Sequence, residues 1–243
     1  MGIMKYSIRK KSDSIMKIYK GLALFWVLTF AIMPLNVMAK EDKDSKDKGE
    51  EIKTARRVFE KLDCQALEIL SPSTRLDMLD YWDADSVYKA SNEMEGLSWL
   101  ESLSDNYLKL RITAVSSLEI KILPCKKENI VMTIYTVGNS TQAQDSQIDF
   151  YDSQLEKIET SKHFDMPELK EFFEIPKGSL TSMKEIRQMI PFPTVAYSAS
   201  ADNDDLTARL TVEEFVNLDD WNIIKLFLKP EIKAEWKKEK YKF

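Results

Sequence analysis

Residues 107–124, YLKLRITAVSSLEIKILP, decide the fold class. Apolar and polar side chains alternate in two runs that the short link 114–116 separates. The apolar positions are Leu108, Leu110, Ile112, Leu118, Ile120 and Ile122, and the polar positions between them are Lys109, Arg111, Glu119 and Lys121. An alternation of period two is typical of β-strands with one dry and one wet face. This stretch therefore predicts an antiparallel hairpin whose charged side chains face solvent.

Further strands are expected on the C-terminal side of this hairpin. Residues 129–138 are almost continuously apolar, which favours a central strand, and residues 146–151 and 155–158 follow after short polar links. Four or five successive strands with short connections form an antiparallel meander. We place the meander at residues 106–159.

The segments before the meander have helical spacing. Apolar residues recur through 51–70 with helical spacing in the early part, and Ser71-Pro72-Ser73 is a suitable start for a second helix over 74–82. In that helix we expect Leu76, Leu79 and Trp82 to face inward. The polar stretch 87–98 is expected to be irregular. We therefore assign residues 52–100 to a helical part.

The C-terminal half combines helices and hairpins. Helices are predicted over 166–173, 180–190 and 219–228, and hairpins over 194–211, with a turn at 202–205, and over 231–243, with a turn at 237–240. We predict an α+β fold in a single domain, residues 52–243. Its N-terminal helices pack on the antiparallel meander, and the smaller helix-and-hairpin part, 160–243, completes the same unit.

The chain begins with the pattern of a secretory signal peptide. Basic residues in 5–20 precede the apolar run 21–37, and Val37 and Ala39 are suitable for cleavage before Lys40. We predict a signal peptide at 1–39, with Met16 as a candidate functional start, and a charged disordered linker at 40–51. An uncleaved membrane anchor is the alternative. No cysteine directly follows the apolar run, so we expect no lipoprotein. Because cleavage removes the apolar run, we expect no transmembrane segment afterwards.

Charge and composition restrict the function. The chain has 35 basic and 40 acidic residues, and residues 1–39 hold six basic and one acidic residue. The remainder therefore carries 29 basic and 39 acidic residues, a net charge of −10. Such a surface argues against nucleic acid as a partner.

Few residues suggest catalysis. His163 is the single histidine, and neither a nucleophile elbow nor a phosphate-binding glycine loop is present. Asp77 and Asp80 share a helix face, with Asp83 and Asp85 close behind, so they form either an acid pair, a calcium site or a solvated surface. The acidic segment 202–205 is either a cation loop or a hairpin turn. We assign no catalytic residue, no metal ligand and no cofactor.

Cysteines and aromatic residues leave alternatives open. Cys64 and Cys125 form either a disulfide or two separate buried thiols. Several aromatic side chains belong either to the core or to an exposed binding surface: Tyr81, Trp82, Trp99, Tyr107, Tyr135, Phe150, Tyr151, Trp221 and Trp236.

Several blocks of the chain resemble one known family. The blocks are 75–82, 105–124 and 136–152, and residues 232–236 fit the family's ending loosely. They resemble an uncharacterised family of secreted Bacteroidales proteins, domain of unknown function 3256. The resemblance implies an exported α+β protein in the cell envelope and carries over no catalytic residue.

Two functions of different classes are compatible with these features. The first is a non-enzymatic periplasmic or envelope protein that binds a partner protein or glycan through a sheet face or an edge strand. The second is a hydrolase acting on glycan or peptidoglycan through an acid pair such as Asp77 and Asp80. The scarcity of catalytic patterns favours the first.

Cleavage of the leader can be tested directly. We expect the protein isolated from the cell envelope to begin at Lys40, because Ala39 is the small residue that signal peptidase requires before the cut. Intact-mass measurement checks this. A product that retains residues 21–37 would support the anchor instead.

Overall fold

The computed structural model describes residues 54–86, 88–140 and 143–243, so the predicted signal peptide and linker lie outside the described residues. The α-helices in these ranges are α1 (Ala55–Lys61), α2 (Pro72–Asp83), α3 (Met183–Met189) and α4 (Leu218–Ile224). Short 3-10 helices are η1 (Gln65–Leu67), η2 (Thr160–Lys162), η3 (Leu169–Phe172) and η4 (Glu213–Phe215). No helix in the described ranges is long and apolar enough to cross a membrane.

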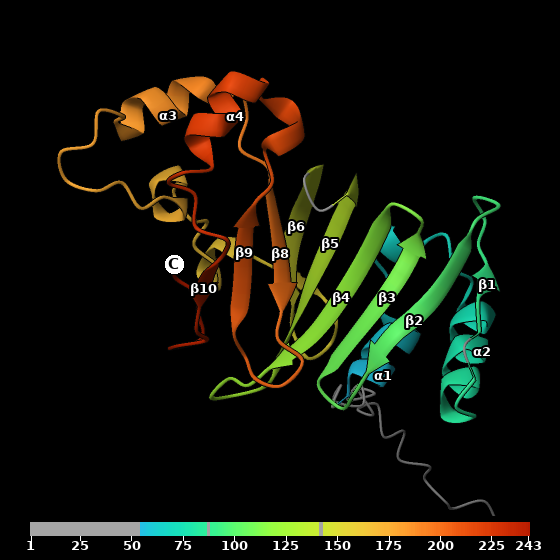
Figure 1. Ribbon diagram of the computed structural model, residues 1–243. Coiled ribbons are helices and arrows are strands. Elements are labelled where there is room, and N and C mark those ends of the chain that lie inside the picture. Colours follow the sequence, from blue (N-terminus) through green and yellow to red (C-terminus); the bar gives the residue numbers. More distant parts are fainter. Residues whose placement is uncertain (1–53, 87, 141–142) are drawn as a thin grey trace, which may run out of the picture. The chain divides into compact units, whose positions relative to one another are not determined.

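Two antiparallel sheets form the centre of the fold (Figure 1). In the large sheet the spatial order equals the chain order: β1 (Ala90–Ser91), β2 (Leu97–Leu103), β3 (Tyr107–Thr113), β4 (Ser116–Leu123), β5 (Ile130–Ser140), β6 (Ala143–Tyr151) and β7 (Lys157–Ile158). The small sheet has the order β10 (Ile232–Ala234), β9 (Leu206–Leu210), β8 (Val195–Ala199). The predicted α+β class with an antiparallel meander is confirmed.

Each face of the large sheet is apolar over only one half of its strands, and the apolar half is a different one on each face. One face packs against α1 and α2, and we call it the helix face; the other packs against β8–β10, and we call it the small-sheet face. One row of cross-strand neighbours on the helix face is Leu110, Leu118, Tyr135 and Gln147. One row on the small-sheet face is Lys109, Glu119, Ile134 and Ile148. The apolar half therefore lies over β3–β4 on the first face and over β5–β6 on the second.

The N-terminal core covers the apolar half of the helix face. Val58, Phe59 and Leu62 are fully buried against β3 and β4. The predicted helix 51–70 is wrong in length, because α1 ends at Lys61 and η1 starts afresh. Arg75 of α2 explains the break: its Nη1 donates to the carbonyl oxygens of Phe59 at 3.0 Å and Leu62 at 2.8 Å. Arg75 thus donates hydrogen bonds to carbonyl groups at the end of α1 that have no donor within the helix.

The buried face of α2 differs from the face that the sequence predicts to be buried. The predicted start at Ser71-Pro72-Ser73 is confirmed, and Ser71 caps the helix by accepting a hydrogen bond from the Thr74 backbone. Leu79 is buried as expected, whereas Leu76 is 49 % exposed and Trp82 is 36 % exposed. Arg75, Met78 and Leu79 form the inward face instead. The contact between Arg75 and α1 sets this rotation of the helix.

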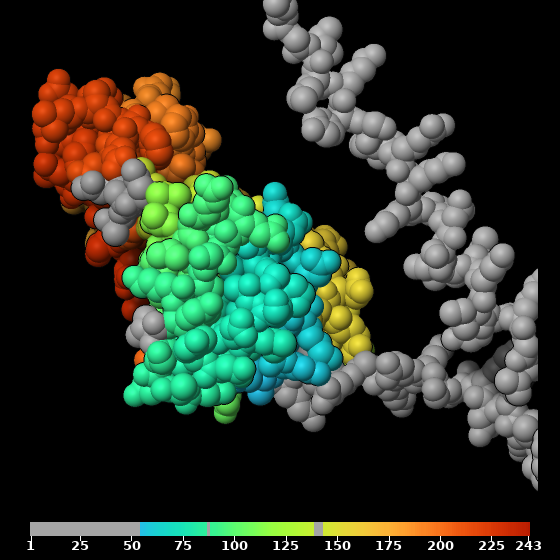
Figure 2. All heavy atoms as spheres, turned by 90° about the vertical axis from the view of Figure 1, so that its right-hand side faces the viewer, coloured from blue at the N-terminus to red at the C-terminus, as the bar shows by residue number. Residues whose placement is uncertain are grey.

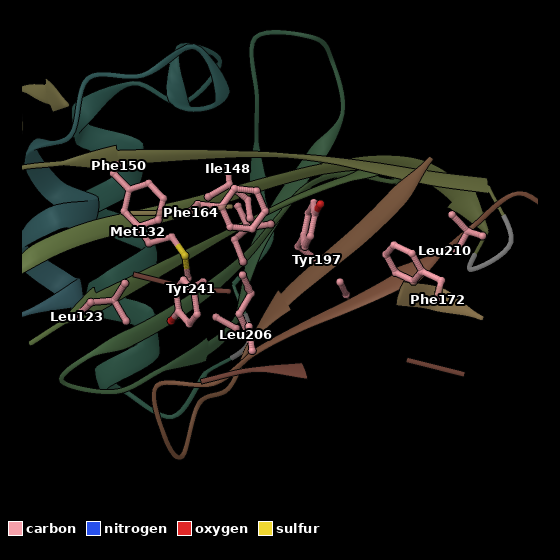
Figure 3. Close-up of a cluster of buried hydrophobic side chains, with 14 of the residues drawn as sticks. Leu123, Met132, Ile148, Phe150, Phe164, Phe172, Tyr197, Leu206, Leu210 and Tyr241 are labelled. Atoms are coloured by element: carbon pink, nitrogen blue, oxygen red, sulfur yellow. The ribbon is translucent and has the colours of Figure 1, made fainter. Parts of the chain in front are cut away.

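The C-terminal half builds a second core on the small-sheet face. Its side chains come from β5, β6, the small sheet and the helices around it (Figure 3). The largest buried members include Met132, Phe150, Phe164, Phe172, Tyr197, Leu206 and Tyr241. Because residues 130–134 of β5 are buried on both faces, the prediction of a central strand is confirmed.

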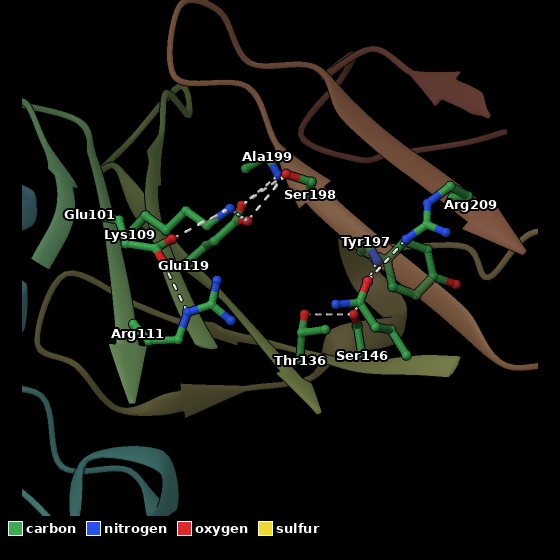
Figure 4. Close-up of polar contacts among 11 residues, drawn as sticks. Glu101, Lys109, Arg111, Glu119, Thr136, Ser146, Tyr197, Ser198, Ala199 and Arg209 are labelled. Atoms are coloured by element: carbon green, nitrogen blue, oxygen red, sulfur yellow. Dashed lines mark hydrogen bonds and ion pairs between the residues drawn. The ribbon is translucent and has the colours of Figure 1, made fainter. Parts of the chain in front are cut away.

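The charged residues of β4 are buried, which corrects the prediction of a solvent-facing side. Glu119 is 5 % exposed and accepts hydrogen bonds from the Ala199 backbone at 2.8 Å and from the Ser198 hydroxyl at 3.1 Å (Figure 4). Its carboxylate also lies 3.5 Å from Lys109 Nζ. Burial raises the pKa of Glu119, and Lys109 opposes this rise. Strand β8 crosses this side of β4 and removes it from water.

Lys121 is also enclosed. It is 1 % exposed, and its Nζ lies 3.6 Å from Oδ1 of Asp204 in the turn between β8 and β9. Burial lowers the pKa of Lys121, and Asp204 acts in the opposite direction. Alternation along the strand could predict the side on which Lys121 lies, but not that a distant turn would cover it.

The end of the chain pairs differently from the predicted hairpin. Residues 232–234 form β10 and pair with β9. The turn at Lys237–Lys240 is present, but Tyr241 continues from it to Phe164 in a parallel bridge. The Tyr241 hydroxyl donates to the Asp204 carbonyl oxygen at 2.8 Å. The last residues therefore tie the small sheet to the segment that follows β7.

Within the stretch 87–98, the described residues 88–98 are more regular than predicted. They contain β1 and the start of β2, joined by a turn in which the buried Asn92 accepts hydrogen bonds from the backbone of Met94 and Gly96. Its amide nitrogen donates to the Ile112 carbonyl oxygen at 3.1 Å. With α1 and α2 these strands form one continuous surface at this end of the molecule (Figure 2). Two-residue strands are too short for periodicity to detect.

The orientation of α2 provides a stability test. We expect Leu79→Ala to lower the free energy of unfolding by about 2–5 kcal/mol, because Leu79 is enclosed by the N-terminal core. Leu76→Ala on the same helix should cost about 0.5 kcal/mol or less, since its side chain is half exposed. Urea denaturation followed by circular dichroism measures both. Equal losses would contradict the observed face of α2.

Candidate functional site

A large hollow among the described residues lies on the polar half of the helix face. We call it the sheet groove. It has a volume of about 750 Å³, with Thr133 and Tyr135 of β5 and Gln147 and Asp149 of β6 as part of its floor. The turn after α1 and the loop before β7 form its walls. The groove exists because α1 and η1 cover only the half of this face that β3 and β4 make apolar.

The lining of the sheet groove is acidic. Four carboxylate side chains contribute to it: Asp63, Glu68, Asp149 and Glu156. Lys157 is the one basic side chain in the lining, and its Nζ pairs with Asp149 Oδ1 at 2.9 Å. The groove therefore carries three net negative charges. A cation or a positively charged side chain is the ligand that such a lining favours.

Half-buried and apolar groups complete the groove. Tyr135 is partly exposed and Thr133 is buried, and Ile69 and Leu155 add apolar surface at the walls. Tyr151 lies at the base, and burial raises the pKa of its hydroxyl to about 12, so it stays protonated and can donate a hydrogen bond. An aromatic ring beside carboxylates is a suitable contact for an ammonium or guanidinium group.

The acid pair considered from the sequence lies elsewhere. Asp77 and Asp80 are exposed on α2, and neither contributes to the sheet groove. Asp83 pairs with Arg56 of α1, and Asp85 lies in the turn after α2 with a positive φ of 52°. The structure thus places these carboxylates on a solvated helix surface and in its closing turn.

The acidic segment 202–205 forms the turn of the β8–β9 hairpin. The Ser200 hydroxyl accepts hydrogen bonds from the backbone of Asp202 and Asn203, and the Asn203 side chain accepts one from Asp205. Asp204 faces Lys121. No group of three or more histidine, cysteine, aspartate or glutamate side chains with metal-binding geometry occurs in residues 54–86, 88–140 and 143–243.

His163 is held in an aromatic stack rather than on an open loop. Its Nδ1 lies 2.9 Å from the carbonyl oxygen of Glu239, which accepts the hydrogen bond from the protonated ring nitrogen. Its ring packs beside Phe150 and Trp236, with centroid distances of 5.4 and 6.2 Å. His163 also borders a second hollow of about 530 Å³ together with Cys125. The sequence indicated neither contact, because residues 76 positions apart form the hydrogen bond.

Some of the aromatic residues considered from the sequence belong to the core, and others are exposed. Tyr107, Phe150 and Tyr151 are buried, while Trp99, Tyr135, Trp221 and Trp236 are partly exposed. Tyr81 and Trp82 are exposed on α2, and Tyr81 stacks on Tyr88 with the ring centroids 4.2 Å apart. Of this set, only Tyr135 and Tyr151 reach the sheet groove. Sequence alternation places them on the correct face but does not show that this half of the face stays open.

Cys64 and Cys125 are two free, partly buried thiols. Burial raises the pKa of Cys64, which borders the sheet groove, and raises the pKa of Cys125 to about 11. Thiolates are the nucleophilic form of cysteine, so neither side chain is an activated nucleophile at neutral pH.

This state of the cysteines predicts slow alkylation. At pH 7.5 we expect iodoacetamide to modify both thiols at least about tenfold more slowly in the native protein than in the urea-denatured protein, because less thiolate is present. Mass spectrometry after timed quenching measures the two rates. Denaturing, non-reducing titration should count two thiols for each chain, and a count of zero would show a disulfide.

Comparisons with known proteins agree with this fold. None of the curated proteins compared with the chain matches it. One similar solved structure is described as a domain of an uncharacterized protein from Porphyromonas gingivalis W83. It is 22 % identical, covers 77 % of this chain and 96 % of its own, and superposes with a TM-score of 0.64, which shows a shared fold. The model of the family described as protein of unknown function (DUF3256) matches residues 50–241, and the chain therefore belongs to this family.

Proposed function

We propose that this protein is an exported, non-enzymatic binding protein of the cell envelope, and that the sheet groove holds a positively charged segment of a partner protein. The acidic groove carries this proposal. Four carboxylates and one lysine line a hollow of about 750 Å³, a size within the usual range for ligand sites. Export is supported by the basic and apolar pattern of residues 5–39.

Charge complementarity favours a cationic peptide over a glycan. A glycan site usually presents exposed aromatic faces with neutral hydrogen-bonding groups, whereas this groove has one partly exposed tyrosine and a net charge of −3. Lysine or arginine side chains can pair with the exposed Glu68 and Glu156 and pack against Tyr135. Asp77 and Asp80, the acid pair considered for a glycan hydrolase, lie outside the groove.

A defined peptide series tests the groove. We expect a fluorescein-labelled hexapeptide of alternating lysine and alanine to bind the purified protein at low ionic strength, with the affinity falling as salt screens the charges. Counterparts with serine or glutamate in place of lysine should bind at least about tenfold more weakly. Fluorescence anisotropy measures all three peptides. Equal affinity for the serine and lysine peptides would refute the proposed ligand class.

Variants locate the binding on the molecule. Glu68→Gln combined with Glu156→Gln removes two exposed groove charges, each worth about 0.5 kcal/mol, so we expect affinity for the lysine peptide to fall about fivefold. The matched control is Asp77→Asn combined with Asp80→Asn, which removes the same charge from the exposed surface of α2. Loss of affinity in the control as large as in the groove variant would place the contact outside the groove.

A further inference from the structure

A third, smaller hollow lies on the opposite face of the large sheet, between that sheet and the small one. We call it the inter-sheet hollow; its volume is about 220 Å³. Arg111, Ser117 and Thr136 are direct cross-strand neighbours on β3, β4 and β5, and their side chains form its floor. Strands β8 and β9 form the opposite wall with Ser198 and Arg209. This hollow shares no lining residue with the sheet groove.

The charge of the inter-sheet hollow has the opposite sign to that of the groove. Lys109, Arg111 and Arg209 supply three positive charges, and Glu119 and Glu231 supply two negative ones. The lining residues by themselves carry one net positive charge, and Glu101, just outside the lining, pairs with Arg111 and lies 4.0 Å from Lys109. A small ligand with a single negative charge suits such surroundings better than a dianion.

Two guanidinium groups are held in place at this hollow. The Nε of Arg111 donates to Glu101 Oε1 at 2.9 Å, a bond that uses none of the four N–H bonds on its terminal nitrogens. Arg209 Nη2 donates to the Gln144 side-chain oxygen at 2.9 Å. Figure 4 shows the two guanidinium groups on opposite sides of the space above Thr136 and Ser146. Fixed guanidinium groups lose little further freedom when they bind a carboxylate, and they can donate two parallel hydrogen bonds to it.

Of the two acidic residues at the hollow, Glu119 is occupied by other groups. Glu119 accepts hydrogen bonds from Ser198 and Ala199 and pairs with Lys109. The Ser117 hydroxyl adds a neutral donor on the floor, and the Thr136 hydroxyl shares a hydrogen bond of 2.8 Å with the Ser146 hydroxyl.

We propose that the inter-sheet hollow binds a small monocarboxylate, whose carboxylate is held by the guanidinium group of Arg111, with Arg209 on the opposite side. The volume of the hollow is roughly seven times the 30 Å³ that one water molecule occupies in the liquid. This is enough for a short-chain acid and too little for a peptide. The site is separate from the sheet groove and does not depend on the function proposed for it.

Isosteric probes test the charge requirement. Isothermal titration calorimetry of the purified protein with propionate should give a Kd in the millimolar range or tighter. Propionamide, which has the same shape without the charge, should bind at least tenfold more weakly, and so should inorganic phosphate, which is mainly dianionic at pH 7.5. Sodium chloride at matched ionic strength corrects for screening. Equal binding of propionate and propionamide would overturn the proposal, and tighter binding of phosphate would overturn the monocarboxylate assignment.

Variants test the position. Arg111→Gln should weaken propionate binding at least tenfold, whereas Arg187→Gln on the exposed surface of α3 should leave it unchanged. Arg111→Lys keeps the charge but loses the paired N–H donors, so it should bind with intermediate affinity and control for a fold that the glutamine variant disturbs. Thermal unfolding shows that each variant is native before titration. Wild-type affinity in a folded Arg111→Gln protein would refute the site.

Discussion

Residues 130–134 of strand β5 are buried on both faces, and the rest of the structure depends on this constraint. The strand separates two hydrophobic cores, one built with α1 and α2 and the other with the C-terminal half. A sheet face that carries apolar side chains must be covered by another layer. Because β3–β4 and β5–β6 expose their apolar sides to opposite faces, the sheet requires two separate covers, one from each end of the chain.

This placement of the apolar halves on opposite faces also creates the sheet groove and the inter-sheet hollow. Each cover packs on the apolar half of its face and extends only partly over the polar half. On the helix face the polar half stays open and forms the acidic sheet groove. On the small-sheet face β8 crosses the polar half, buries Glu119 and Lys121, and leaves the inter-sheet hollow beside them. Buried charges require such partners, since an unpaired buried ion is strongly destabilising. Lys109 and Asp204 meet this requirement.

Sequence patterns predict the candidate sites only in part. Alternation places Tyr135 and Thr136 of β5 on opposite faces of the sheet, since period two fixes the side within one strand. Only the pairing register of the structure places Gln147 beside Tyr135 and aligns Arg111 and Thr136 through Ser117. It does not reveal which half of a face stays open. The chemistry visible in the sequence at Asp77 and Asp80 belongs to a solvated helix surface, whereas the groove collects carboxylates from segments that are distant in sequence, such as Glu68 and Glu156.

The sequence by itself determined the antiparallel meander, the start of α2 at Ser71 and Pro72, and the hairpin of β8 and β9, because period, caps and turns are local properties. Only the tertiary structure decided where α1 ends, which side of α2 is buried, and that Glu119 and Lys121 lie away from water. Each of these depends on a partner far along the chain: Arg75 for α1 and α2, and β8 with its following turn for β4. Local periodicity carries no information about such distant partners.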